Sequence, residues 1–321
     1  MNDYSHARTR NSDPYLKKLR RRRVVVVGLI ALVAMLAISG TVYAILRIAR
    51  DRDIPVASQQ ELVQLWLTKD YSGISAACDL ALQDDPLDSF RLVFKGMSSF
   101  YLGLAEIDGE KRSTLMDTAV FSIRKALLDP KAPLRPQAMY VLGKAYFHKG
   151  QDYWDETMTY LREASGAGYT AADTWEYLAL AAQGIGQTQE SIAFFEKAMT
   201  AKPGSPELML AAAVANGSAG NQARSEELAL AALSTTADEY LAERCNFMLG
   251  ESYRKAGRFT EAMARYEAIK EKNPQSADAW FYEGLVLLDT GDPIKARAAW
   301  RKAVSIDPMH PGARQKLSER S

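Results

Sequence analysis

The chain has 321 residues, of which 47% are hydrophobic and 25% are charged, with 40 basic and 39 acidic side chains. The near-neutral total hides an uneven division: residues 1–53 hold 11 Lys/Arg and 4 Asp/Glu, a net charge of +7, and the remaining 29 and 35 give −6. A mildly acidic body argues against a nucleic-acid-binding protein, which needs a basic face.

The first element along the chain is an uncharged apolar run from Val24 to Leu46. As a helix it would extend about 35 Å, enough for a hydrocarbon core of about 30 Å. Six basic residues directly precede the run and three follow it, so the positive-inside rule places the N-terminus in the cytoplasm and the rest of the chain across the membrane. We therefore predict a basic cytoplasmic tail at 1–23, a transmembrane helix at 24–46 and a linker at 47–54.

A cleaved signal peptide is the alternative interpretation of this run. Val42, Tyr43 and Ala44 form a weak cleavage site. The run is longer than the apolar region of about 7–15 residues that signal peptides have, which favours a retained anchor.

Beyond the linker, a pattern of large and small residues recurs at a spacing of about 34 residues. In residues 277–310 the markers are Trp280, Gly284, Leu287, Gly291, Ala296, Trp300, Ala303 and Pro308. In residues 243–276 they are Asn246, Gly250, Tyr253, Gly257, Ala262, Tyr266, Ile269 and Pro274. Gly250 and Gly284 would let two helices approach closely, and large residues further on would fill the gap. Gly257 and Gly291 would end the first helix, because glycine adopts the left-handed cap conformation at little cost.

This W-x2-L-G-x2-Y…A-x3-F…P pattern resembles the tetratricopeptide repeat family, in which each unit is a pair of antiparallel helices. The resemblance implies an all-α solenoid of about seven helix–turn–helix units preceded by one transmembrane helix, in a membrane-anchored bacterial type. The units are predicted at 55–88, 89–135, 136–171, 172–205, 206–239, 243–276 and 277–310, and a C-terminal capping segment at 311–321.

Three departures from the family pattern carry expectations of their own. Lys95 and Glu283 stand where the family has a leucine, and either side chain is expected to snorkel or to form an ion pair. An insertion from Leu104 to Thr114 is polar, and we expect it to be a solvated loop between helices.

No constellation of catalytic residues is present in the sequence. The three histidines, His6, His148 and His310, have no second ligand at metal-binding spacing, and there is neither a phosphate-binding loop nor a G-x-S-x-G motif. The cysteines Cys78 and Cys245 lie in different units, so we expect no disulfide between them and expect both to pack as small apolar residues. We therefore predict a protein that is not an enzyme and has no cofactor.

In the tetratricopeptide repeat family, fixed positions of the first helix of each unit line a concave groove that binds a protein partner. Mapped onto this chain, the resemblance implies a groove formed by Tyr140, Lys144, Phe147, Leu210, Val214, Phe247, Glu251, Arg254, Phe281, Leu285 and Leu288. Phe247 and Phe281 share one position in adjacent units and should lie side by side, with Arg254 two turns beyond to receive an acidic group. The alternative is that individual aromatic residues pack between neighbouring units.

These features favour an interaction scaffold held on the periplasmic face of the bacterial inner membrane, in secretion, envelope or motor-complex assembly. It would bind protein partners through the groove and the membrane through residues 24–46, without nucleic acid. Two alternatives stay open: a carbohydrate-binding or enzymatic accessory module that uses aromatic residues such as Tyr140 and Phe281, and the same scaffold facing the cytoplasm.

Overall fold

The structure is a computed structural model that describes residues 57–319. The chain divides into two compact units, Met1–Ser58 and Gln59–Ser321, and all described helices belong to the second. The predicted tail, transmembrane helix and linker lie outside the described residues. Between residues 57 and 319, no helix combines the length and the apolar character that crossing a membrane requires.

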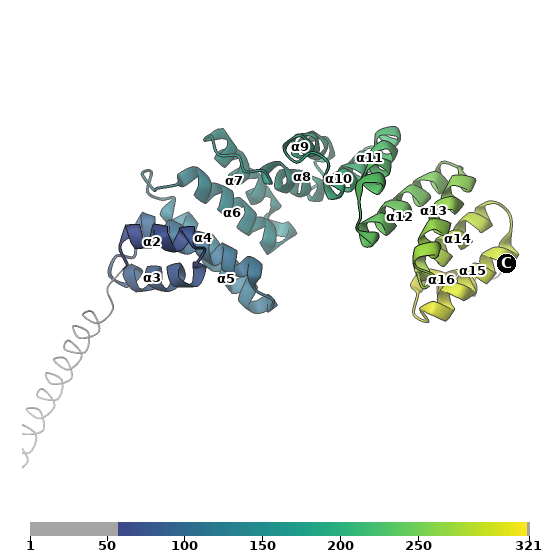
Figure 1. Cartoon of the computed structure of the whole chain (residues 1–321), viewed down its shortest axis with the longest axis horizontal. Helices are drawn as coiled ribbons and strands as arrows, with labels where there is room; N and C mark the ends of the chain where they lie inside the picture. Colours follow the sequence, from purple (N-terminus) through teal and green to yellow (C-terminus); the bar gives the residue numbers. More distant parts are fainter. Residues whose placement is uncertain (1–56, 320–321) are drawn as a thin grey trace, which may run out of the picture. The chain divides into compact units, whose positions relative to one another are not determined.

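Residues 57–319 form fifteen α-helices and one short 3-10 helix, and contain no strand. The helices are α2 (Gln59–Leu67), α3 (Tyr71–Asp84), α4 (Ser89–Ala105), α5 (Gly109–Ala126), α6 (Arg135–Lys149), η1 (Gln151–Tyr153), α7 (Trp154–Gly166), α8 (Thr174–Gly184), α9 (Thr188–Ala201), α10 (Pro206–Ser218), α11 (Gln222–Thr235), α12 (Glu239–Lys255), α13 (Phe259–Lys272), α14 (Ala277–Asp289), α15 (Pro293–Ile306) and α16 (Pro311–Ser318). Consecutive helices pack together as seven pairs, from α2 with α3 to α14 with α15, and α16 follows alone (Figure 1). The predicted all-α solenoid is confirmed for this part of the chain.

Glycine notches hold the two helices of a pair together. A Cβ atom added to Gly250 on α12 would lie 2.7 Å from the ring of Tyr266 on α13. Gly143 faces Leu161 in the same way, at 2.8 Å. Each notch therefore receives a large side chain from the second helix, as the recurring small and large residues predict.

The repeat period is also visible in buried hydrogen bonds. Ser191 Oγ on α9 donates to the backbone oxygen of Ala179 on α8 at 2.9 Å. Exactly the same bond recurs 34 residues later, where Ser225 Oγ on α11 donates to the oxygen of Ala213 on α10 at 2.8 Å. Residues 206–239 therefore form the same kind of helix pair, although few sequence markers remain in them.

Glycines end the first helix of the last two pairs. Gly257 and Gly291 have φ values of 74° and 85°, in the left-handed region that side chains with a Cβ avoid. Their backbone N–H groups donate to the oxygens of Arg254 and Leu288, both at 3.0 Å. This is the geometry expected of glycine just past a helix end.

The expectation of a loop from Leu104 to Thr114 is wrong. Helix α4 continues to Ala105 and α5 begins at Gly109, so only residues 106–108 lie outside helices. Asp108 caps α5 by accepting from the N–H of Lys111 at 3.1 Å. The insertion of about 11 residues equals about three helical turns, so it lengthens both helices without rotating their packed faces.

The two charged residues at leucine positions both form ion pairs. Lys95 Nζ on α4 lies 2.5 Å from Asp79 and donates to Ser75 Oγ at 2.8 Å, both on α3. Glu283 on α14 pairs with Lys270 on α13. Each charge thus binds the preceding helix, where a leucine would make an apolar contact.

Helix α16 covers the end of the last pair. Its Ala313 is fully buried in a cluster with Ala296, Trp300 and Ala303. The Arg297 guanidinium on α15 donates to the backbone oxygen of Leu317 at 3.0 Å. A terminal repeat needs such a cover because no further unit buries its apolar face.

Both cysteines should resist thiol reagents until the protein unfolds. Cys78 and Cys245 are free, and neither has exposed surface. Burial raises the pKa of the Cys78 thiol to about 12, so raising the pH from 8 to 9.5 should not make it reactive, because the thiolate is the nucleophile. The sign follows from this shift: the fold favours the neutral thiol, so stability is lost only as the pH rises above the ordinary thiol value.

The measurement is maleimide labelling of the full chain, counted by mass spectrometry with and without denaturant. Rapid labelling of either cysteine in the folded chain would contradict the packing described here. Labelling that appears only in denaturant would match it.

Candidate partner-binding site

A hollow of about 800 Å³ opens where the C-terminal end of α10, the first turn of α11 and the C-terminal half of α12 meet. We call it the α10–α12 hollow. Its lining residues are Val214, Gly217, Ser218, Gln222, Ala223, Ser225, Glu226, Met248, Glu251, Ser252, Tyr253, Lys255, Ala256 and Arg258. Two of the predicted groove residues, Val214 and Glu251, are among them.

Small residues on α10 and α11 form the floor of the hollow. A Cβ atom at Gly217 would lie 3.1 Å from Ser225 Oγ, so the two helices approach closely here. Val214, one turn earlier on α10, keeps 39% of its surface exposed. The hollow therefore has an accessible apolar side chain above a rigid junction between two helices.

A polar network fixes the wall at the end of α12. Tyr253 Oη donates to Glu226 Oε1 at 2.9 Å, and Arg258 donates to Glu226 Oε2 at 2.7 Å. The Arg258 guanidinium also lies 4.1 Å from the centre of the Tyr253 ring. The hydrogen bond from Arg258 lowers the pKa of Glu226, and burial raises the pKa of Tyr253. Glu226 is thus an anion whose oxygens are already used by the chain.

The second acidic residue of the hollow, Glu251, is tied to Arg254. Arg254 donates to Glu251 at 2.9 Å and to Asp289 on α14 at 2.6 Å. Burial opposes ionisation of Glu251, but the hydrogen bonds from Arg254 outweigh it and lower the pKa. Arg254 was expected to receive an acidic group from a partner. Instead, two carboxylates of the chain itself neutralise it and join α12 to α14.

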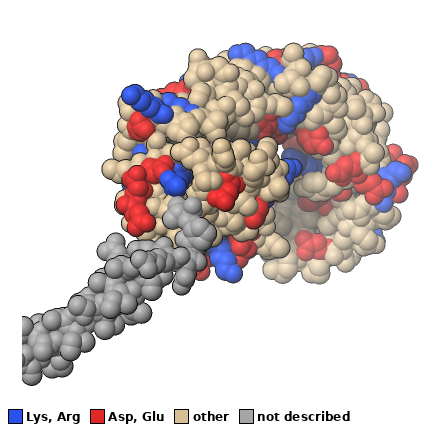
Figure 2. Space-filling model, turned by 60° about the vertical axis from the view of Figure 1, so that its left-hand side comes forward, with Lys and Arg blue, Asp and Glu red and all other residues tan. Residues whose placement is uncertain are grey.

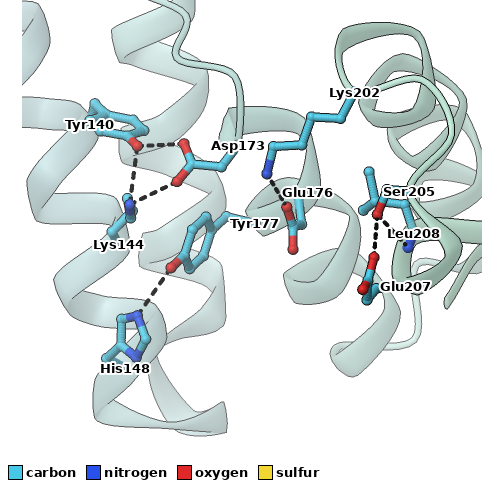
Figure 3. Close-up of polar contacts among 10 residues, drawn as sticks. All are labelled: Tyr140, Lys144, His148, Asp173, Glu176, Tyr177, Lys202, Ser205, Glu207 and Leu208. Atoms are coloured by element: carbon cyan, nitrogen blue, oxygen red, sulfur yellow. Dashed lines mark hydrogen bonds and ion pairs between the residues drawn. The ribbon is translucent and has the colours of Figure 1, made fainter. Parts of the chain in front are cut away.

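The predicted groove residues of α6 pack against the next unit (Figure 3). Lys144 Nζ lies 2.9 Å from Asp173 Oδ2 and 3.1 Å from Tyr140 Oη, and Tyr140 donates to the same carboxylate. Both Tyr140 and Lys144 are buried. Burial and the hydrogen bond to Asp173 raise the pKa of Tyr140. Lys144 also faces the Tyr177 ring at 4.8 Å, so these residues serve the junction between α6 and α8.

Phe147 has a similar place. Its ring centre lies 5.0 Å from that of Tyr177 on α8 and 5.7 Å from that of Trp154 on α7. His148, the next residue, contacts the Tyr177 hydroxyl at 3.2 Å. Burial, which is the largest cause, and the charge of Lys144 lower the pKa of His148 and raise that of Tyr177 to about 12 by burial alone and nearby carboxylates, respectively.

The structure places Tyr282 against both phenylalanines that were expected side by side. Its ring centre lies 5.7 Å from that of Phe247 and 5.2 Å from that of Phe281. Phe281 also packs on α16, where a Cβ atom at Gly312 would lie 2.6 Å from its ring, and on His310 at 4.9 Å. The Phe281 ring therefore helps to dock the terminal helix.

The remaining predicted groove residues divide by exposure. Leu210 is buried with Leu241 and Cys245, and Leu285 packs on the core of the last pair. Leu288 keeps 39% of its surface exposed. Of the apolar residues predicted for the groove, Val214 and Leu288 are thus the most accessible.

Glu226, Tyr253 and Arg258 were missed as site residues in the sequence. Tyr253 served only as a repeat marker, and the other two are charged residues at a turn or on a second helix. Their spacing gives no signal, because what joins them is the approach of α11 to the turn before α13.

Charges of both signs are scattered over the molecule. Figure 2 shows Lys/Arg and Asp/Glu side chains in small mixed groups on the face in view. A surface without one dominant sign is typical of protein recognition, and nucleic acid requires a basic field.

Family models described as tetratricopeptide repeat match residues 172–205 and residues 247–311. No curated protein matches the sequence. Among solved structures, the chain is similar to the C-terminal part of a TPR repeat-containing protein from Cytophaga hutchinsonii, with 15% identity and a TM-score of 0.61, over 82% of this chain and 100% of that chain.

It is also similar to PilW, described as a widely conserved type IV pilus biogenesis factor, with 17% identity and a TM-score of 0.54, over 70% of this chain and 98% of that chain. A chain of the APC/C hetero-tetramer Cut9-Hcn1 matches 84% of this chain with 14% identity and a TM-score of 0.47, and this chain spans half (50%) of that one. The matched segments and the helix pairs agree: the chain contains tetratricopeptide repeats.

Proposed function

We propose that the protein is a membrane-anchored, non-catalytic interaction scaffold and that the α10–α12 hollow receives a segment of a protein partner. The observation that carries this proposal is the hollow itself. It has the volume of several side chains, an exposed apolar residue in Val214, and the charged side chains of Glu251 and Lys255 nearby. A site with an apolar centre and a mixed polar rim suits a peptide segment.

The topology that we propose follows the charge asymmetry of the N-terminal region. Residues 1–23 would be cytoplasmic, residues 24–46 would span the inner membrane, and the repeats from 55 to 310 with their cap would be periplasmic. PilW, which has a similar fold, is described as a pilus biogenesis factor. We propose a role of the same broad kind, in the assembly of a secretion, envelope or motor complex.

Photo-crosslinking tests the binding site. A photoactivatable amino acid at Val214 of the full chain, irradiated in intact cells, should give one or a few discrete protein adducts. The matched control is Glu267, an exposed position on α13 outside the hollow. Equal adducts at both positions, or none at Val214, would count against the hollow as the site.

A reporter enzyme that is active on only one side of the membrane, fused after Ser321, tests the topology. Activity in the periplasm is expected. Activity of the cytoplasmic reporter instead would reverse the orientation and leave the crosslinking result intact.

A further inference from the structure

A second hollow, of about 580 Å³, lies at the other end of α12. We call it the Asn246 hollow. The end of α11 with the turn that follows, the first two turns of α12 and the C-terminal half of α13 enclose it, and none of the predicted groove residues lines it. It is therefore separate from the α10–α12 hollow.

The Asn246 hollow exists because one repeat lacks its large marker residue. The position 34 residues beyond Asn246 is Trp280, whose indole packs on the core of the last pair with Ala303. The Trp280 indole N–H donates to the oxygen of Pro274 at 3.3 Å. Ile269, the counterpart of Ala303, lines the hollow. The space that an indole fills in one unit is thus open in the unit before it.

Asn246 leaves an unused acceptor in this space. The residue is only 8% exposed, and its Nδ2 donates to the backbone oxygen of Ala242 at 3.0 Å. That bond fixes the orientation of the amide, because the flipped form would face one oxygen with another. Asn246 Oδ1 has no hydrogen-bond partner within the described residues. A buried acceptor without a partner favours a ligand that brings an N–H or O–H donor.

The rim of the hollow selects the charge of that donor. Asp238, Glu239 and Glu243 line it against a single cation, Lys272. Asp238 accepts the N–H of Tyr240 at 2.9 Å and Glu243 accepts from Ser276 Oγ at 3.1 Å, which leaves further lone pairs on both carboxylates. The excess of carboxylates favours a cation.

An exposed aromatic ring completes the rim. Tyr240 keeps 69% of its surface exposed, and the Arg244 guanidinium lies 5.9 Å from the centre of its ring. The chain itself thus shows that this ring accepts a guanidinium nearby. Such a planar cation stacks on an aromatic face and presents several donors to carboxylates and amide oxygens.

We propose that the Asn246 hollow binds an arginine side chain of a protein partner. The guanidinium would donate to Asn246 Oδ1 and to the rim carboxylates, and its stem would cover Ile269 and Ala268. This site goes beyond the proposed function, since it neither uses nor requires the α10–α12 hollow.

Titration of the full chain with N-acetyl-arginine amide tests the site. In protein labelled with ¹⁵N at asparagine, the signals of Asn246 and Asn273, which both line the hollow, should shift saturably. Those of Asn216 and Asn221 on α10 and before α11 should stay in place. N-acetyl-glutamate amide should shift neither set. No saturable shift at Asn273 with the arginine probe, or an equal shift with the acidic probe, would overturn the proposal.

Two variants separate binding at the hollow from binding elsewhere. Asn246→Trp places in the hollow the residue that the next unit has there, and it should abolish the Asn273 shift. Glu239→Gln with Glu243→Gln keeps the hollow open and should weaken the arginine probe about tenfold through lost charge attraction. If Asn246→Trp does not fold, the glutamine pair decides, and unchanged affinity in it would overturn the proposal.

Discussion

Gly250→Leu should lower the free energy of unfolding of the full chain by about 1–3 kcal/mol. The added Cβ would lie 2.7 Å from two atoms of the Tyr266 ring, and the rest of the leucine would have to enter the same space. Tyr266 has no exposed surface, so its ring cannot swing into solvent. Leucine gains about 1 kcal/mol over glycine in helix propensity. The overpacking should exceed that gain because it displaces a fully buried ring.

Gly166→Leu is the matched control for this substitution. Gly166 is the last residue of α7, and a Cβ there would meet no other atom within 4 Å. Its effect should stay within about 0.5 kcal/mol. Urea unfolding followed by circular dichroism at 222 nm compares both variants with the parent. Equal stability of the two variants would mean that the α12–α13 notch is not tightly packed.

The helix pairs were predictable from the sequence because their packing is local. A small residue on the first helix and a large one 16 residues later, as in Gly250 and Tyr266, always face each other across the same short turn. The polar insertion at 104–114 defeated this reasoning. Polarity marks a surface but does not distinguish a loop from the exposed side of a helix, and a length near three turns let α4 and α5 absorb it.

The candidate site was less predictable, since it depends on what the neighbouring unit presents. A repeat position fixes the direction in which Tyr140 or Arg254 leaves its own helix. It does not reveal that Asp173 or Asp289 waits opposite, because those residues lie on the next unit and outside the repeat pattern. Val214 stayed accessible because the residues facing it across the hollow are small.

Lys144→Met should destabilise the protein by about 2 kcal/mol at pH 7. Removing one partner of a fully buried ion pair costs about 3–5 kcal/mol. The Lys144 side chain is 8% exposed, but that of Asp173 is 26% exposed, and the water that reaches Asp173 reduces the cost. Methionine fills most of the lysine stem, so the loss mainly reports the missing charge beside Asp173 and the rings of Tyr140 and Tyr177.

The pH dependence distinguishes lost charge from lost packing. Burial alone would raise the pKa of Asp173, but hydrogen bonds from Lys144 and Tyr140 lower it below its ordinary value of 3.8. The pair therefore contributes stability above that value, and the contribution is lost as the pH falls through the lowered pKa. The difference between Lys144→Met and the parent should shrink as the pH falls below about 4.

Lys197→Met is the matched control. Lys197 is exposed and its Nζ lies 4.4 Å from the centre of the Trp175 ring, so its replacement should cost at most about 1 kcal/mol and show no such pH dependence. Urea midpoints measured for both variants from pH 7 to pH 3.5 provide the comparison. A pH-independent loss in Lys144→Met would mean that the lysine acts through its stem. A loss no larger than that of Lys197→Met would mean that water at the α6–α8 junction solvates Asp173 well enough without its cation.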